Sequence, residues 1–165
     1  MSSKSRVGLF IAGVGLAVGV WGFIGCQNKA ANPSVTPGPT TGPMATLTIT
    51  VTGLKTHKGN LIFGVFDQAD GFPKEAKKSV NWQVKPADGD SITFTCRLPV
   101  GVYGASVLHD ENGNGEMDLG LFGIPKEGYG VTNNPKPKMR AATFKESLFS
   151  LGQQGANLTI SLQYF

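Results

Sequence analysis

The stretch TLTITVT at residues 46–52 alternates strictly between polar and apolar residues. Successive side chains of a β-strand point to opposite faces, so this alternation places all the apolar residues on one face. We therefore predict a half-buried strand here, with Leu47, Ile49 and Val51 facing the core.

Further short segments of strand character follow, separated by turns rich in Gly, Pro, Asn and Asp: residues 61–66, 81–84, 92–96, 102–109 and 156–165. Residues 61–66 are apolar on both faces, which favours a central strand. Many short strands with little helix are typical of an antiparallel sandwich. We predict an all-β, antiparallel β-sandwich of the transthyretin-like or immunoglobulin-like kind.

One segment interrupts this rhythm. Residues 110–142 contain many glycines and prolines and no clear periodicity, and loops of this length in a compact domain tend to be functional or internally organised. The segment ends at Thr143-x-x-Glu146, which has the form of a capping box. We therefore expect one long loop, then a short helix at residues 143–149 leading into the last strand.

The long loop begins with DENGNGEMD at residues 110–118, which has the spacing of a calcium loop. Calcium takes six to eight oxygen ligands, and a Gly at position 6, here Gly115, allows the sharp turn. Position 12 is Leu121 and not Glu, which excludes a full EF-hand and predicts weak binding of Ca²⁺. The alternative is an Asn-Gly turn without a metal. The candidate ligands are Asp110, Asn112, Asn114, Glu116 (through its backbone carbonyl) and Asp118.

The N-terminus has the features of an export signal. Lys4 and Arg6 precede an uncharged run at residues 7–24, and the tetrapeptide ending at Cys26 resembles a bacterial lipobox, with Phe23 where Leu is usual. We predict a lipoprotein-type signal peptide at residues 1–25 and lipidation of Cys26. The alternative is an uncleaved membrane anchor, because 18 apolar residues are long enough to span a bilayer.

Either interpretation exports the rest of the chain to the cell envelope, facing the periplasm or the exterior. Residues 26–44 are rich in Pro, Gly and Thr and are predicted to be a disordered tether that holds the domain near the membrane. The remaining residues, 45–165, are long enough for one domain with its own core.

Charge and cysteine content exclude several classes of function. The net charge of +4 falls to +2 without Lys4 and Arg6 (13 basic minus 11 acidic residues), so no nucleic-acid partner is expected. Apart from Cys26 the only cysteine is Cys96, which rules out an intramolecular disulfide. Cys96 follows the inward alternation of its strand, so we predict a buried structural thiol.

Catalysis has little support in the sequence. His109 and Asp110 are adjacent, so on a regular strand they point to opposite faces, and no motif names a nucleophile or a base. We expect a binding or structural module, with His109 hydrogen-bonded to the following loop. The alternative is an envelope hydrolase or other enzyme that uses His109 and loop carboxylates, for which a pocket lined by His109, Asp110 and Glu127 would be needed.

The stretch GIPKEGYG at residues 123–130 carries Lys126, Glu127 and Tyr129 between glycines. One interpretation is a recognition loop for an unknown protein or ligand partner. The other is structural: Glu127 anchors the long loop and can also serve as a further oxygen ligand of the cation, and Tyr129 packs over the loop. We favour the structural interpretation because so long a loop needs an anchor.

Three motifs in order carry a family resemblance: LPVGVY at residues 98–103, HDENGNG at 109–115 and GIPKEGYG at 123–130. Together they resemble a family of exported bacterial proteins known as domain of unknown function 2141, over residues 47–164. The resemblance implies an exported transthyretin-like (prealbumin-like) β-sandwich. It brings no established activity and no catalytic residues.

Overall fold

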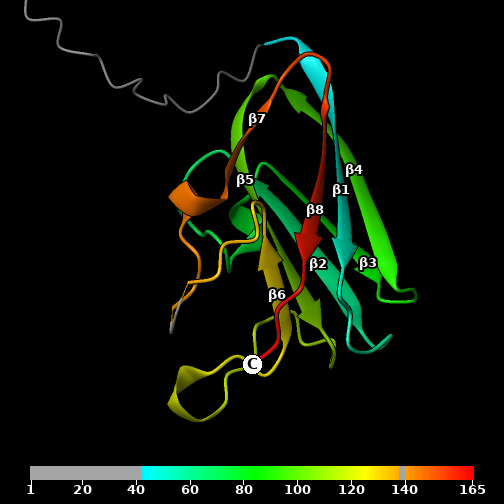
Figure 1. Ribbon diagram of the computed structural model, residues 1–165, viewed down its shortest axis with the longest axis vertical. Helices are drawn as coiled ribbons and strands as arrows, with labels where there is room; N and C mark the ends of the chain where they lie inside the picture. Colours follow the sequence, from blue (N-terminus) through cyan, green and yellow to red (C-terminus); the bar gives the residue numbers. More distant parts are fainter. Residues whose placement is uncertain (1–41, 138–139) are drawn as a thin grey trace, which may run out of the picture. The chain divides into compact units, whose positions relative to one another are not determined.

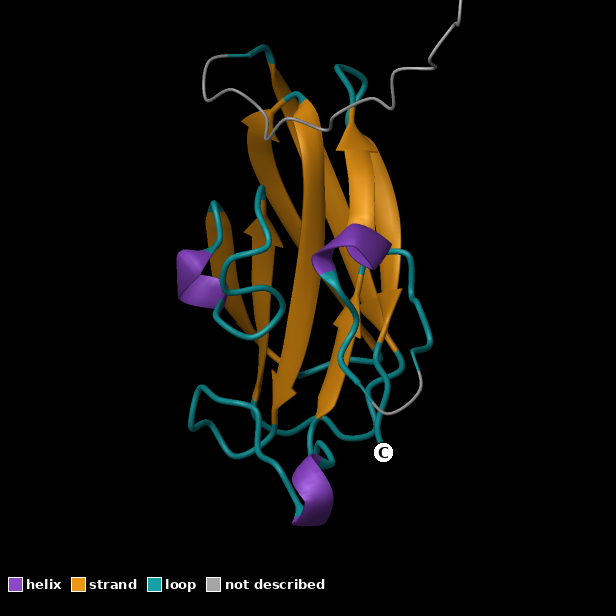
Figure 2. Ribbon diagram, turned by 90° about the vertical axis from the view of Figure 1, so that its left-hand side faces the viewer, coloured by secondary structure: helices purple, strands orange, loops and turns teal. Residues whose placement is uncertain are grey.

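The computed structural model describes residues 42–137 and 140–165, which form two β-sheets packed face to face (Figures 1 and 2). One sheet has the strand order β4-β1-β8, and the other has the order β3-β2-β5-β6, with β7 also paired to β5. The strands are β1 (Met44–Thr52), β2 (Asn60–Phe66), β3 (Asn81–Pro86), β4 (Ser91–Pro99), β5 (Gly101–Asp110), β6 (Gly128–Val131), β7 (Leu148–Leu151) and β8 (Ala156–Ser161). The helices within these described ranges are three 3₁₀ turns: η1 (Ala76–Lys78), η2 (Leu121–Gly123) and η3 (Phe144–Ser147).

The core lies between the sheets and confirms the predicted faces. Leu47, Ile49 and Val51 of β1 are completely buried. The rings of Phe63 on β2 and Phe94 on β4 stack across the interior with centroids 4.8 Å apart. Each such side chain contributes about 1.5–3 kcal/mol by leaving water. The predicted all-β sandwich is therefore confirmed.

Cys96 is buried, as predicted, and burial raises the pKa of its thiol to about 11. The thiol therefore stays protonated and unreactive at neutral pH.

Strand pairing agrees with the predicted sandwich except at one place. β2 is central, between β3 and β5, but β1 and β8 pair in parallel. The reason is topological. β7 runs along β5 toward Gly101, next to the end where β1 starts, because Met44 pairs with Pro99. The chain then crosses to the other sheet, and β8 has to start at the same end as β1.

The segment predicted to be one long loop contains a strand, β6. Tyr129 exchanges two backbone hydrogen bonds with Gln163, of 3.0 and 2.8 Å, so β6 also binds the C-terminal segment. A side chain at Gly130 would collide with Ile160 of β8. The strand was missed because close packing of this segment required glycines, which have low strand propensity.

The predicted helix at residues 143–149 is shorter than expected. It is the single turn η3, and the capping box of Thr143 and Glu146 is present as predicted. The Arg140 guanidinium, which contacts Glu146 at 2.7 Å, holds the pKa of that carboxyl well below its usual range. The turn leads into β7 and not into the last strand. That last strand, β8, ends at Ser161 rather than at residue 165.

The turn between β4 and β5 explains the motif LPVGVY. The Tyr103 hydroxyl donates a hydrogen bond of 2.8 Å to the Pro99 carbonyl, which pins the chain where it passes from one sheet to the other. A Cβ at Gly101 would lie 3.2 Å from the Tyr103 ring, so a larger residue here would have to displace that ring slightly.

The predicted signal peptide at residues 1–25, Cys26 and nearly all of the predicted tether lie outside the described residues. In the described parts of the chain, no helix has the length and apolar character needed to cross a membrane.

Candidate functional site

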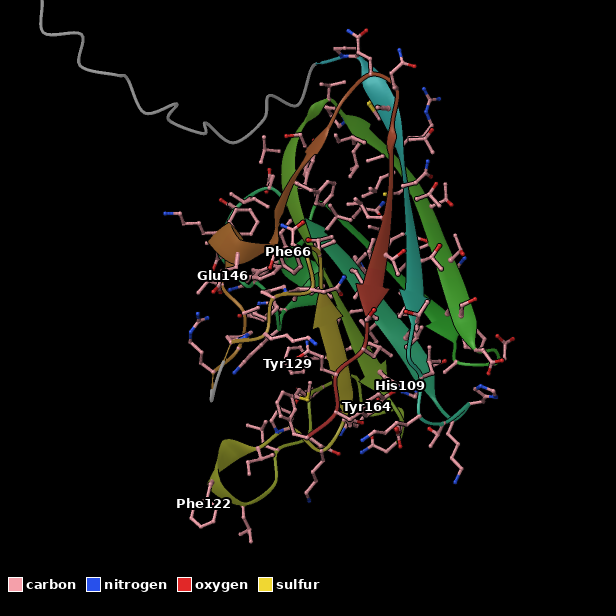
Figure 3. All side chains as sticks on the ribbon, in the orientation of Figure 1. Phe66, His109, Phe122, Tyr129, Glu146 and Tyr164 are labelled. Atoms are coloured by element: carbon pink, nitrogen blue, oxygen red, sulfur yellow. The ribbon has the colours of Figure 1, made fainter. Side chains whose placement is uncertain are left out.

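His109, near the end of β5, is fully buried. Its Nδ1 lies 2.6 Å from the Tyr164 hydroxyl, and its Nε2 lies 2.9 Å from the Lys58 carbonyl (Figure 3). The expected bond to the following loop is replaced by these two partners, which are distant in sequence. Only the Glu111 carboxylate of that loop approaches, at 3.8 Å. The histidine joins the β1–β2 loop and the C-terminal segment to β5.

Asp110 holds the loop that follows. Its side chain is 2% exposed and accepts three backbone hydrogen bonds: from Gly113 at 2.8 Å, Asn114 at 3.1 Å and Gly115 at 2.8 Å. Gly113 and Gly115 have φ of 78° and 81°, a region that favours glycine. The loop therefore turns around one buried carboxylate.

The other predicted side-chain ligands gather in the same loop. Asn112 and Asn114 donate their amide N–H groups to the two oxygens of Asp118, at 2.6 and 3.1 Å. Their own side-chain oxygens accept from the backbone of Asn114 and Glu116, at 3.0 and 2.8 Å. The structure thus brings four predicted side chains together. Glu116, predicted to bind through its backbone carbonyl, lies in the same loop, where its N–H donates to the Asn114 side chain.

This donor set consists of hard oxygens, the chemistry that calcium prefers. Two of the four side chains are amides, and no group of three or more His, Cys, Asp or Glu suited to a metal occurs in residues 42–137 and 140–165. A cation here would have to replace the hydrogen bonds between the amides and Asp118.

Glu127 has the predicted anchoring role. Its side chain is 4% exposed and accepts backbone hydrogen bonds from Glu111 at 3.0 Å and from Asp118 at 3.1 Å. It therefore ties the two ends of the loop to the start of β6. Lys126 is exposed, as a recognition residue would be. Tyr129 does not pack over the loop as expected, because its ring stacks on Phe165 with centroids 5.8 Å apart.

Beyond this anchor the chain forms a small protruding turn, residues 119–125, which we call the finger. Its base is closed by a 2.9 Å hydrogen bond from the Lys126 N–H to the Asp118 carbonyl. Figure 3 shows Phe122 at its tip, pointing away from the sheets. The large apolar side chains of the finger are exposed: Leu119 (52%), Leu121 (83%), Phe122 (99%) and Ile124 (49%).

A surface groove of about 650 Å³ lies on the outer face of the β3-β2-β5 sheet, between the η1 segment and the Asp110 loop. Its charged lining residues are Lys74, Glu75 and Lys77 on the η1 side and Asp110 and Glu116 on the loop side. His109 and Glu127 are not among its lining residues. The apolar residues that line it are Ile62, Trp82, Val84, Leu108, Met117 and Leu119.

β3 is inverted relative to an ordinary half-buried strand. Trp82 and Val84 face outward at 50% and 46% exposure. The polar residues that alternate with them are turned to β4, where Gln83 donates a 3.2 Å hydrogen bond to the Thr95 carbonyl and Lys85 donates to the Thr93 carbonyl. The sequence analysis did not predict this outward apolar face of β3, because a Trp-x-Val alternation ordinarily indicates residues that face the core.

The fold and the loop define a class: an all-β sandwich domain with a buried-carboxylate loop, a finger and an apolar groove at one edge. Residues 49–159 match the model of a family described as uncharacterized proteins conserved in bacteria (DUF2141), and the chain belongs to this family. The match includes the loop, the finger and the groove. Comparisons with curated proteins and with solved structures found no match. The finer assignment as transthyretin-like stays a prediction.

Proposed function

We propose that the protein is an exported, lipid-anchored binding module of the cell envelope, whose partner docks in the groove beside Trp82. The inverted strand β3 carries this proposal. Trp82 and Val84 each leave about half of their apolar surface in water, and a partner that covers them would recover the free energy of burying that half.

Charge suggests the chemistry of the partner. Lys74 and Lys77 line the groove, and neither has a carboxylate within 4.0 Å among the described residues, whereas Lys78 is paired with Asp70 and Glu75. Of the carboxylates that line the groove, Glu75 is paired with Lys78, and Asp110 and Glu116 lie on the loop side. We infer a ligand with an apolar part that covers Trp82 and an anionic group on the η1 side, near the two lysines and away from the loop carboxylates.

Site-specific photocrosslinking tests the groove. A photoreactive residue in place of Val84 should form an adduct in the native envelope, and Trp82→Ala should remove that adduct. The matched control is a photoreactive residue in place of Thr95, which is exposed on β4 of the other sheet. Adducts of equal yield at both positions would contradict a specific site.

The lipid anchor rests on the sequence around Cys26. Cys26→Ser should leave a larger, unprocessed precursor and abolish incorporation of labelled fatty acid. A Ser variant that is processed and labelled like the parent would exclude Cys26 as the lipidated residue, and cleavage elsewhere would indicate a soluble exported protein.

We further propose that the Asp110 loop binds Ca²⁺ weakly. The gathering of Asp110, Asn112, Asn114 and Asp118 in one loop supports this, and Kd of roughly 10⁻⁴ to 10⁻³ M is typical of extracellular modules. Bound Ca²⁺ should stabilise the fold by about 1–3 kcal/mol at a ten- to hundredfold excess over Kd. Thermal unfolding with chelator and with millimolar calcium measures this, and an unchanged midpoint would leave a metal-free turn as the better account.

No observation favours the alternative of an enzyme. Such a site needs a concave pocket around His109, Asp110 and Glu127. His109 and Glu127 are instead buried against their hydrogen-bond partners, and only Asp110 lines the groove.

A further inference from the structure

The finger has an apolar surface that the sandwich does not use. Residues 119–125 contain no charged side chain, and the two most exposed of them, Leu121 and Phe122, are 83% and 99% exposed. Exposed large apolar side chains are ordinary when scattered singly, but a contiguous group on a protruding turn indicates a contact surface.

The backbone of the finger is closed on itself. The Gly120 N–H donates to the Ile124 carbonyl at 2.7 Å, and the Gly123 N–H donates to the Gly120 carbonyl at 3.2 Å. An apolar lipid environment offers no hydrogen-bond partners, so a segment that enters it must satisfy its polar groups internally. The finger meets part of this requirement, because the N–H groups of Gly120, Gly123 and Ile124 donate to carbonyls within it.

Phe122 has φ of 62° and ψ of 20°, a left-handed conformation that is uncommon for an aromatic residue. The ring gains no contact with the sandwich in return, since it is 99% exposed. A strained backbone that holds an apolar ring in water points to a function for the exposed ring.

A lipid surface is within reach of the finger. β1 starts beside Pro99, at the end of the sandwich opposite Asp110 and the finger, as Figure 1 also shows. Residues 27–43 span at most about 60 Å when extended, whereas the ten residues of β5 span about 34 Å. The segment between an anchor at Cys26 and the start of β1 is therefore long enough for the finger to reach the membrane that holds the anchor.

We propose that the finger inserts into a lipid bilayer, with Leu121 and Phe122 below the headgroups and the exposed Lys126 among anionic headgroups. Aromatic and leucine side chains beside a basic residue have the composition of interfacial membrane segments. The finger then makes a second attachment beside the anchor, which orients the sandwich on the membrane. The inference rests on the anchored state proposed above, which Cys26→Ser tests separately.

The test uses the full chain in vesicles of equal parts phosphatidylethanolamine and phosphatidylglycerol. Phe122→Cys carries an environment-sensitive fluorophore, and Gln153→Cys, in the exposed β7–β8 turn at the other end of the sandwich, is the matched control. The parent protein is labelled in parallel, because Cys96 is buried and Cys26 supplies any background.

We expect the label at residue 122 to lose its quenching by aqueous iodide and to gain quenching by nitroxide lipids, while the label at residue 153 stays open to iodide. Adding Leu121→Asp should restore iodide access at residue 122. Iodide access at residue 122 in vesicles overturns the inference, and shielding seen only in native envelope fragments would assign the finger to a protein partner instead. Protection at residue 122 that persists in unlipidated Cys26→Ser protein would show that the finger inserts independently of the anchor, which is tested by fatty-acid labelling alone.

Discussion

The segment between β5 and β6 consists of two halves with opposite construction. In the first half, residues 110–118, polar side chains turn inward and satisfy one another and the backbone. In the second half, the finger at residues 119–125, apolar side chains turn outward into water. Side-chain oxygens hold the backbone of the first half, whereas the finger is held by hydrogen bonds between its own backbone groups.

The first half is therefore stabilised by contacts within itself, whereas the exposed side chains of the finger are suited to contact with something outside the domain. The first half needs nothing beyond its own hydrogen bonds to keep its shape. The finger keeps its shape by backbone bonds and by the Glu127 anchor, but its side chains lower the free energy of the protein only when something covers them. Substitutions in the two halves should therefore change stability in opposite directions.

Asp110→Ala should have the largest effect. It leaves three backbone N–H groups without their carboxylate, at a cost of about 2–3 kcal/mol in the free energy of unfolding. It should also remove any dependence on calcium while the sandwich stays folded. Chemical denaturation measures the change, and Glu116→Ala, an exposed side chain in the same loop, should stay within about 0.5 kcal/mol of the parent. Equal losses in both variants would break the comparison.

Glu127→Gln should cost about 1–2 kcal/mol. The amide keeps the shape of the side chain, but only one of its two end atoms accepts a hydrogen bond, so either the Glu111 or the Asp118 N–H loses its partner. Faster hydrogen exchange at those two amides, with the exchange of β1 unchanged, would show that the anchor is local. Uniform acceleration would mean that Glu127 supports the whole sandwich.

Phe122→Gly should stabilise the protein by about 0.5–1 kcal/mol. Glycine removes a left-handed penalty of about 1–2 kcal/mol, and its greater freedom in the unfolded chain returns roughly 0.5–1 kcal/mol of this. Leu121→Ala, at a similarly exposed neighbour, should be nearly neutral. A loss of stability in Phe122→Gly would mean that the ring supports the fold after all.

The smallest expected effect is on the rate of deamidation at the two Asn-Gly pairs. Deamidation of Asn112 or Asn114 begins when the backbone nitrogen of the next glycine attacks the side-chain carbonyl, and both of these glycine N–H groups donate to Asp110. Peptide mapping by mass spectrometry should find slow deamidation in the parent and faster deamidation in Asp110→Ala. Equal rates would show that the hydrogen bonds do not protect the pairs.

Local patterns predicted much of the molecule. The alternation of Leu47, Ile49 and Val51 assigned the core face of β1, and the spacing of Thr143 and Glu146 located the cap of η3. The anchoring role of Glu127 followed from the need to hold a long loop. Such features can be predicted from sequence because they depend on a single residue or on the spacing of residues that are close together in the chain.

Other features depend on partners far along the chain. The sequence gives no sign that His109 would meet Lys58 and Tyr164, or that β8 would pair in parallel with β1. The finger had a weak signal, four large apolar residues among glycines without strand alternation, yet their exposure depends on what the rest of the domain fails to cover.

The sequence by itself determined an all-β domain, the core faces of its main strands, a buried thiol at Cys96 and a loop that gathers oxygen atoms after β5. These depend on side-chain periodicity and on hydrogen bonds within a few residues. Only the tertiary structure decided that β3 is inverted, that a groove forms beside Trp82 and that Phe122 projects into water. The reason is that solvent exposure is a property of the assembled sheets, and no single segment contains it.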